Sequence, residues 1–268
     1  QGLTGLEAAM DELAHRLGVD PVELRRKNML HEGETSEVFR IMGEGTEGIA
    51  MNIESCKLEE CIARGKELIG WDPGHLVREV APGKLRAKGM AIAMQGSGIP
   101  LIDMGSARIE FQDGGFFKLH VGATDLGTGS DTILAQIAAE ELGVDMEDIV
   151  VHSSDTDHTP FDVGAYASST TYVSGSAVLK AARSLKAKLI GAVADKFGVA
   201  PGDVIYKDKT FRTADGTQSL SLDDFSYDTL YHDGAKMKTI EVTESFTGDK
   251  SPPPYLAAFV EIDLDVET

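Results

Sequence analysis

Cysteine is scarce in this chain, which has only Cys56 and Cys61 among its 268 residues. An iron–sulfur cluster needs about four thiolates, so these two cysteines exclude a cluster held by this chain alone. They lie five residues apart in a helix-like segment, where that spacing places them on poorly matched faces. We therefore expect two buried free thiols in a reducing compartment and no disulfide.

Long apolar runs and a surplus of basic residues are also missing. No apolar run approaches the ~18 residues of a membrane span, and no stretch has the pattern of a signal peptide. There are 25 Lys and Arg against 44 Asp and Glu, for a formal net charge of −19. This balance excludes nucleic acid and anionic membranes as partners, so we expect an acidic cytoplasmic protein. Because the chain opens with Gln-Gly and not with Met, we expect a piece of a longer polypeptide or a processed subunit.

The helix and strand signals in the sequence predict two segments. The first covers residues 1–80 and is mainly helical. A capping box at Thr4-x-x-Glu7 and a start signal at Asp20-Pro21 each precede an apolar helical pattern, and Gly70 ends the last helix. The prolines between residues 72 and 87 predict a boundary. Helices are expected over about 4–17, 21–30, 36–42 and 57–69.

The second segment, residues 81–268, mixes strands and helices. The turn Asp113-Gly-Gly115 between two strand-like runs predicts an antiparallel hairpin. We therefore expect an α+β fold, in which a helical N-terminal segment is followed by a mixed or antiparallel sheet packed against helices, and not a doubly wound parallel sheet. Helices are expected over 130–142 and 173–197, and strands over 90–95, 106–112, 116–121, 149–153, 204–207, 210–212, 240–246 and 256–264.

One local pattern occurs three times, as Leu17-Gly-Val, Leu142-Gly-Val and Phe197-Gly-Val. In each copy a glycine follows the last apolar residue of an expected helix, and a fresh turn begins after it. We interpret the pattern as a repeated glycine C-cap. The unequal spacing of the copies excludes a solenoid repeat.

A glycine-dense loop, Gly122-Ala-Thr-Asp-Leu-Gly127-Thr128-Gly129-Ser130, lies between an expected strand and an expected helix. Glycines allow close backbone approach, and the unpaired N–H groups at a helix start favour an anion such as a phosphate. A plain helix-starting turn explains the same residues. The loop also lacks the lysine of a P-loop and the third glycine of the dinucleotide-binding fingerprint.

A second loop, Asp155–Thr171, is rich in hydroxyl groups and ends at the start of the expected long helix. Its last residues, Ser168-Ser-Thr-Thr171, offer side-chain donors beside free backbone N–H groups. A helix cap with polar neighbours is the simpler alternative. Two such loops in one chain suit an extended cofactor that carries several polar groups.

These residues resemble the molybdenum-cofactor-binding subunit of the xanthine dehydrogenase and aldehyde oxidase family. The runs Gly122–Gly143 and Asp155–Ala177 carry the likeness, together with the opening Gln1–Asn28 and the stretches Gly89–Ser106 and Pro252–Asp265. The resemblance covers nearly the whole chain in the family's order. It is closest to bacterial xanthine or purine hydroxylases, through Asp155-Thr-Asp and Tyr166-Ala-Ser.

The resemblance implies the fold and the chemistry of that family. A molybdenum atom would be held by molybdopterin, in its simple or its cytosine dinucleotide form, and not by protein ligands. A Mo–OH oxygen would attack an electrophilic carbon of a purine or another N-heterocycle, and a hydride would pass to Mo=S. Electrons would leave through 2Fe-2S clusters and FAD on partner subunits or domains, so that the protein supplies positioning and electrostatics.

The resemblance also assigns residues. Gly127, Thr128, Gly129 and Ser130 would contact the pterin and its phosphate or nucleotide tail. Ala167 would lie beside the molybdenum, and the cofactor phosphates would be bound by Ser168, Ser169, Thr170 and Thr171. The turn Gln95-Gly-Ser97-Gly98 would lie near the substrate, with Gln95 and Ser97 as contacts; a simple strand-end turn explains it equally well.

The chain departs from the family at one position and lacks two of its parts. Thr128 stands where the family loop usually has glutamine, and its hydroxyl offers one donor where the amide offers two. The family's general-base glutamate belongs beyond residue 268, and its phenylalanine-bearing and arginine-bearing loops belong before residue 1. Glu140 and Glu141 lie along an expected helix and are read as solvated. We therefore predict no catalytic residue in this chain and no activity for the chain alone.

Other acids and histidines carry simpler interpretations. Asp155, Asp157, His158 and Asp162 do not have the spacing of a calcium loop or a zinc site, so no metal site is expected. His120 alternates with apolar residues and is expected as a partly exposed strand side chain.

Three alternative functions remain open. The same fold could serve as a non-catalytic assembly module or as an aldehyde- or nicotinate-type hydroxylase. A phosphosugar- or nucleotide-binding enzyme would also use the Gly-Thr-Gly loop, but no base or metal cluster supports it.

Overall fold

The computed structural model describes residues 2–41, 47–232 and 239–268, and the chain falls into two compact units. The smaller unit contains residues 1–96 and 252–268, and the larger contains residues 97–251. Each unit is described by itself. These units do not begin and end where the two expected segments do, and the division at residue 80 stays a prediction.

The smaller unit combines four helices with a three-stranded antiparallel sheet. The sheet has the order β1-β2-β10, in which β2 pairs with β10 along its whole length and with β1 over residues 84–87. The β1–β2 hairpin occupies most of residues 72–87, the stretch in which the boundary was expected. The elements are α1 (Gly2–Leu17), α2 (Pro21–Arg26), α3 (Val38–Ile41), α4 (Leu58–Ile69), β1 (Val77–Ala81), β2 (Lys84–Met94) and β10 (Tyr255–Asp265).

A small apolar core joins the helices of this unit to its sheet. Trp71 packs edge-on against Phe259 of β10, with 5.6 Å between ring centroids, and its Nε1 donates to the Asp20 carboxylate at 3.2 Å. Asp20 also accepts the N–H of Val22, so the predicted start of α2 is confirmed. Thr4, however, lies inside α1 and not at its start. The core residues are Val22, Leu58, Ile62 and Met90.

The two cysteines differ from expectation. Cys56 precedes α4 and is half-buried, while Cys61 is exposed on that helix. Both are free thiols, as expected, but neither is buried. The helical pattern did not distinguish the exposed face of α4 from the buried face that carries Leu58 and Ile62.

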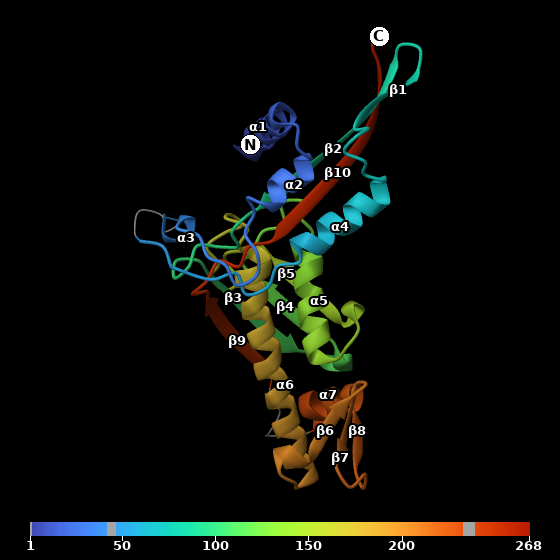
Figure 1. Ribbon diagram of the computed structural model, residues 1–268. Coiled ribbons are helices and arrows are strands. Elements are labelled where there is room, and N and C mark those ends of the chain that lie inside the picture. The colour runs from blue at the N-terminus through green and yellow to red at the C-terminus, as the bar shows by residue number, and fades with distance from the viewer. Residues whose placement is uncertain (1, 42–46, 233–238) are drawn as a thin grey trace. The chain divides into compact units, whose positions relative to one another are not determined.

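The larger unit is built around a mixed four-stranded sheet of order β5-β4-β3-β9 (Figure 1). β3 pairs antiparallel with β4 and β9, and β4 pairs parallel with β5. Helix α5 connects the two parallel strands. The elements are β3 (Met104–Phe111), β4 (Phe117–Val121), α5 (Ser130–Leu142), β5 (Ile149–Ser153), α6 (Gly175–Phe197) and β9 (Ile240–Thr247).

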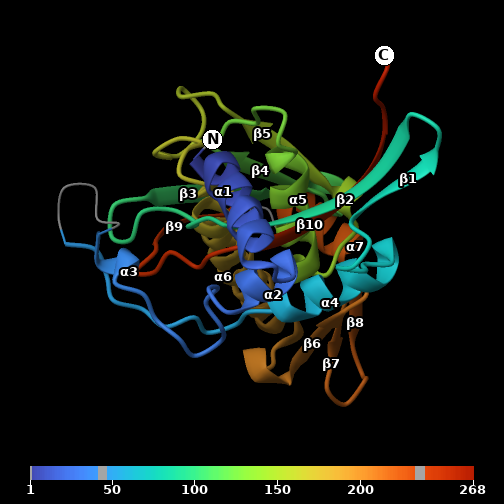
Figure 2. The same cartoon turned by 45° about the horizontal axis from the view of Figure 1, so that its top comes forward.

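Helices α5 and α6 lie against this sheet and against each other (Figure 2). Their inward residues are mostly alanine and leucine, which allow close packing and bury a continuous apolar core with β3 and β4. Within the part of the chain that the structure describes, no helix is long and apolar enough to cross a membrane.

A small three-stranded sheet follows the C-terminal end of α6. Its predicted hairpin is confirmed: Asp208 and Lys209 have φ of 49° and 54° at the turn between the first two strands. The third strand and the short helix after it were not predicted, because both are too brief to show a period. The elements are β6 (Val204–Lys207), β7 (Thr210–Thr213), β8 (Ser219–Ser221) and α7 (Leu222–Tyr227).

The three repeated glycines end helices as predicted. Gly18, Gly143 and Gly198 have φ of 64°, 69° and 68°, a left-handed conformation that glycine adopts without steric cost. A further helical turn or helix follows each one. The helices of both units, together with their antiparallel and mixed sheets, confirm the expected α+β class.

Candidate functional site

The first candidate loop joins the end of β4 to the start of α5. Gly127 and Gly129 have φ of 87° and 76°, and Gly129 is the N-cap residue of α5. The Asp125 carboxylate accepts the backbone N–H of Gly127 at 2.8 Å and of Gly129 at 3.2 Å, and its second oxygen accepts the N–H of Asp131 at 3.4 Å. The anion that this turn holds is therefore its own Asp125.

This arrangement corrects the expectation of free amides in the loop. Desolvation alone would raise the pKa of Asp125, but the backbone N–H donors of the turn outweigh it and hold that pKa below its ordinary value. Thr128 is exposed, whereas Ser130 is buried and its Oγ has no hydrogen-bond partner among the described residues. Asp125 could have been found from the sequence, since Asp-x-Gly is typical of a turn in which the carboxylate binds the following amides.

The second candidate loop reaches the start of α6 through an unusual backbone. Ala167 and Ser168 both have positive φ, 50° and 56°, a conformation that side-chain-bearing residues rarely adopt. Ser169 follows as a buried residue whose Oγ donates to the carbonyl of Tyr166 at 2.8 Å. Thr170 begins a π-helical turn, residues 170–174, that leads into α6.

The hydroxyl groups of this loop are therefore not equivalent. The hydroxyl of Ser169 donates to the Tyr166 carbonyl, and the phosphate contact expected of this residue stays a prediction. Ser168 and Thr171 are exposed and Thr170 is half-buried. Because the first N–H groups of a helix lack partners within it, the start of residues 170–174 presents backbone donors beside these hydroxyls.

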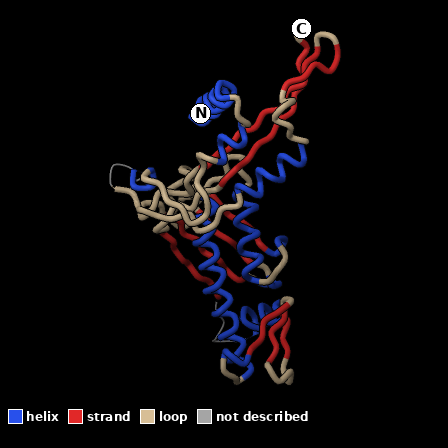
Figure 3. The backbone as a smooth tube through the Cα atoms, in the orientation of Figure 1, coloured by secondary structure: helices blue, strands red, loops and turns tan. Residues whose placement is uncertain are grey.

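The two loops lie against each other where they leave the sheet. A Cβ atom on Gly122 would come within 2.7 Å of the Pro160 carbonyl oxygen and 2.8 Å of the Asp162 Cβ. Ser154 Oγ also donates to the carbonyl of Ala123 at 3.3 Å. Only a residue without a side chain fits at position 122. Figure 3 shows the loops gathered at the end of α5 and α6 where both helices begin.

The turn expected near the substrate is tied to the second loop. Gly98 donates its N–H to the carbonyl of Ala167 at 2.8 Å. Ser97 donates its N–H to Ser251 Oγ at 3.0 Å, and that hydroxyl donates to the Gly98 carbonyl at 2.8 Å. Gln95 belongs to the smaller unit, where its N–H donates to the carbonyl of Pro254 at 3.3 Å. The larger unit thus brings Ser97 close to Ala167.

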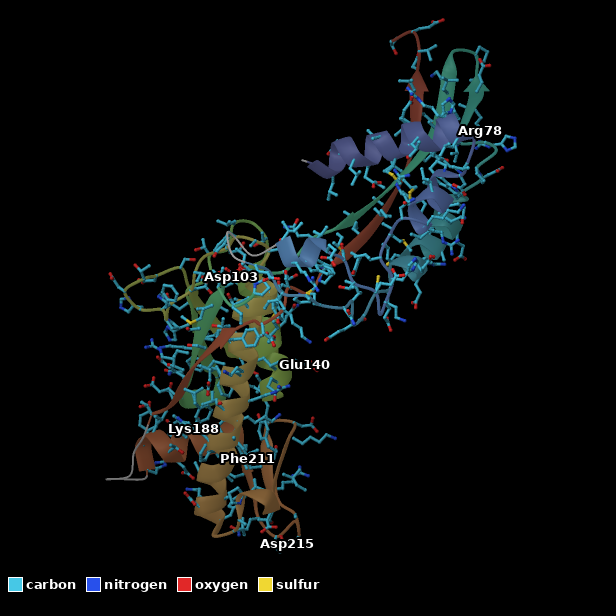
Figure 4. The ribbon with its side chains drawn as sticks, turned by 60° about the vertical axis from the view of Figure 1, so that its left-hand side comes forward. Arg78, Asp103, Glu140, Lys188, Phe211 and Asp215 are labelled. Atoms are coloured by element: carbon cyan, nitrogen blue, oxygen red, sulfur yellow. The ribbon has the colours of Figure 1, made fainter. Side chains whose placement is uncertain are left out.

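A buried carboxylate holds these segments in place. Asp103 is fully buried, accepts the Tyr166 hydroxyl at 2.6 Å and accepts the N–H of Ile99 at 2.8 Å. Figure 4 shows it at the opposite end of α6 from Phe211. Asp162 similarly accepts the Ser174 hydroxyl at 2.6 Å. Sequence reasoning missed Asp103, because nothing local marks an aspartate whose partners lie about four and sixty residues away.

Glu140, Glu141 and His120 were each given a simple interpretation from the sequence, and the structure shows where each one lies. Glu140 is exposed on α5, and Glu141 pairs with Arg183 at 3.1 Å. His120, expected to be partly exposed, is instead buried, because β4 is an inner strand of the sheet. Burial lowers the pKa of His120 despite the nearby Glu110 carboxylate, so its imidazole is neutral at neutral pH.

Residues 64–268 match the family described as the molybdopterin cofactor-binding domain. A probable hypoxanthine oxidase, XdhD, from Escherichia coli K12 is 36% identical over 252 residues, which cover 85% of this chain and 26% of that protein. A putative xanthine dehydrogenase molybdenum-binding subunit, XdhA, from the same strain is 28% identical over 278 residues, covering 99% of this chain and 35% of that protein. The chain therefore spans about a quarter to a third of the length of these relatives.

Solved structures agree on the fold. Quinoline 2-oxidoreductase from Pseudomonas putida 86 superposes with a TM-score of 0.79 at 21% identity, over all of this chain and 35% of that one. A Cu,Mo-CO dehydrogenase superposes with a TM-score of 0.77 at 22% identity, over 99% of this chain and 35% of that one. At such low identity these likenesses establish the architecture alone.

Proposed function

The chain belongs to the molybdopterin cofactor-binding domain family, and from this premise we propose that it forms part of the cofactor site of a molybdenum hydroxylase acting on a purine-like N-heterocycle. The hydrogen bond from Gly98 to Ala167, 2.8 Å long, carries the proposal. It joins the turn proposed to face the substrate to the loop proposed to lie beside the molybdenum.

The second loop fits the phosphate end of such a cofactor. Ser168, Thr170 and Thr171 would bind phosphate oxygens through their hydroxyls and through the first amides of residues 170–174. Ser169 would act by holding Tyr166 in place. Ala167, fixed at positive φ and by the Gly98 bond, would present its backbone next to the metal.

The first loop fits a different part of the cofactor. Because Asp125 already accepts the amides of Gly127 and Gly129, these groups are not free for a phosphate. The exposed face of the turn, at Gly127 and Thr128, would instead line the pterin. Ser130 would support that face from within. The stretch Gly127–Ser130 is then a wall of the site and not its anion-binding part.

The cofactor, when bound, would supply the two-electron chemistry of hydroxylation, and the residues of this chain would bind and orient it. Ser97 would contact the substrate, and the substrate contact expected of Gln95 stays a prediction. The general-base glutamate and the arginine-bearing loop would come from polypeptide outside these 268 residues, so we expect no purine turnover by the chain alone. The proposal also includes iron–sulfur and flavin subunits or domains as partners. It further includes a cytosine dinucleotide form of the cofactor and a cytoplasmic location.

The purine preference is supported by the name of one relative, the probable hypoxanthine oxidase, which is 36% identical. An aldehyde oxidoreductase subunit, PaoC, is 31% identical over 229 residues. A substrate panel on the complete protein separates the two: faster turnover of hypoxanthine or xanthine than of aromatic aldehydes supports the proposal, and the reverse order contradicts it.

The cofactor assignment is tested by Thr171→Glu in the protein that carries this chain. A carboxylate at a helix start stabilises the helix but repels a phosphate there. We therefore expect the molybdenum content per polypeptide to fall severalfold while the thermal midpoint is unchanged or rises. Thr217→Glu, at the remote β7–β8 turn, is the matched control and should keep its molybdenum. Unchanged molybdenum in Thr171→Glu would refute the assignment.

A further inference from the structure

Two histidines and one aspartate converge at the start of the second loop, outside the residues assigned to the cofactor. They follow the pattern His152-x-x-Asp155-x-x-His158. His152 is on β5, and the other two lie on the loop that leaves this strand. Their nitrogen and oxygen atoms all lie within 4.8 Å of one another. We propose that these three side chains bind a divalent transition-metal ion of the zinc class.

The distances within the cluster suit a single ion. Asp155 Oδ2 lies 3.3 Å from His152 Nε2 and 3.2 Å from His158 Nδ1. Zinc ligands sit about 2.0–2.2 Å from the metal in a tetrahedron, whose edges are then about 3.3–3.6 Å long. The Asp155 oxygen already lies near that separation from both imidazole nitrogens, and the two nitrogens lie within 4.8 Å of each other, so the side chains would adjust to bring all three ligands onto one ion.

The backbone around the cluster is already formed. Asp155 Oδ1 accepts the N–H of Asp157 at 3.0 Å, which leaves Oδ2 directed to the histidines. The Asp155 carbonyl accepts the N–H groups of His158 at 3.1 Å and Thr159 at 2.8 Å. Strand pairing fixes His152, which stands opposite His120 of β4. Little ordering is therefore required when a metal binds.

The buried side chain of His120 lies next to this cluster and supplies a second observation. The His120 ring packs against the His152 ring with 5.6 Å between centroids, and its buried Nδ1 has no hydrogen-bond partner among the described residues. Arg108 donates to the His158 carbonyl at 3.2 Å, and its charge is paired with the Glu110 carboxylate at 3.2 Å.

The ligand set defines the class of ion. Imidazole ligands suit Zn²⁺, Ni²⁺ and Cu²⁺, whereas Mg²⁺ and Ca²⁺ prefer all-oxygen sites. Three protein ligands leave coordination positions open to water. The expectation of no metal here weighed His158 without His152, because His152 belongs to a strand and the loop spacing alone does not include it.

Isothermal titration of the metal-free chain with ZnCl₂ tests the site. We expect one saturable Zn²⁺ per chain, with no binding of Mg²⁺ at the same concentrations. Loss of even an outer partner of a metal ligand weakens binding about 10–100-fold, so His152→Ala and His158→Ala should each weaken it at least as much. Circular dichroism of each variant checks that the fold is kept.

His75→Ala is the matched control. His75 pairs with Asp72 at 2.7 Å in an exposed His–Asp pair that has no second histidine. Its removal should leave zinc binding unchanged. If wild type, His152→Ala and His158→Ala bind Zn²⁺ alike, or if none of them binds it, the three side chains form hydrogen bonds only and the proposal is wrong. Molybdenum content is measured separately, so this result and the test of the cofactor site are independent.

Discussion

Each of the two candidate loops of the larger unit forms a turn before a helix, but different contacts hold the two turns in place. In the first loop the amides around Gly127 and Gly129 are held by Asp125, only a few residues away. In the second loop Ala167 and Tyr166 are held by Gly98 and Asp103, more than sixty residues away. The first loop is therefore a local structure, and the second depends on the tertiary fold.

This difference has a consequence for binding. The amides of the first loop are already occupied by a carboxylate, so the loop is pre-formed and does not need a ligand to order it. The second loop keeps exposed hydroxyls at Ser168 and Thr171, while the side chains of Ser169 and Tyr166 are engaged. If the comparison is right, substitutions in the second loop or at its contacts, Gly122 included, affect the stability of the whole unit, and those at residues 125–129 affect only the turn.

The largest expected effect comes from filling the contact between the loops. In Gly122→Val, added carbon atoms would overlap the Pro160 carbonyl and Asp162. Overpacking of this kind costs about 1–3 kcal/mol, and we expect the upper end because the nearest atom is backbone. The free energy of unfolding, measured in urea, checks this. Gly191→Ala, in open space on α6, should instead stabilise by up to about 1 kcal/mol, and equal destabilisation of both would contradict the comparison.

The second effect comes from Tyr166→Phe, which removes the hydroxyl that donates to buried Asp103. Hydrogen bonds to charged groups contribute about 1.5–3 kcal/mol, so we expect a loss near 2 kcal/mol in the same assay. Tyr231→Phe removes a similar bond to exposed Asp113 and is the control. Its effect should be much smaller. A stability equal to wild type for Tyr166→Phe would show that Asp103 does not anchor the loop.

A smaller effect is expected from Ser169→Ala. Its buried hydroxyl donates to the Tyr166 carbonyl, and a single neutral hydrogen bond contributes about 1 kcal/mol. Ser168→Ala alters the exposed neighbour and should stay within about 0.5 kcal/mol of wild type. Thermal unfolding of the pair measures the difference. If Ser168→Ala is the more damaging of the two, the assignment of buried and exposed hydroxyls is reversed.

The smallest effect concerns the first loop and depends on pH. Because the folded-state pKa of Asp125 lies below its ordinary value, the turn is fully stabilised above the ordinary pKa of aspartate and loses this contribution as pH falls through the lowered one. The protection factors of the Gly127 and Gly129 amides, measured by NMR hydrogen exchange from neutral to acid pH, should fall only at low pH. Asp125→Asn should show no such titration. A wild-type midpoint at or above the ordinary value would contradict the hydrogen bonds.

Much of the fold could be predicted because its signals are local. The apolar periods of α5 and α6, the glycine C-caps and the Asp208-Lys209 turn all depend on neighbouring residues. The strands β1 and β8 were missed because one is exposed along its length and the other has only three residues. His120 was misplaced because burial on an inner strand depends on which strands flank it, and pairing order is not written in the strand itself.

By itself, the sequence determined the α+β class, the presence of two polar turns before helices and the family to which the chain belongs, since each follows from patterns of residues near one another in the chain. Only the tertiary structure decided which amides and hydroxyls are free. It engaged Ser169 with Tyr166, buried Asp103 beneath the second loop and brought His152 to Asp155 and His158. A polar group is available to a ligand only when no closer partner takes it, and distant segments become partners only once the chain has folded.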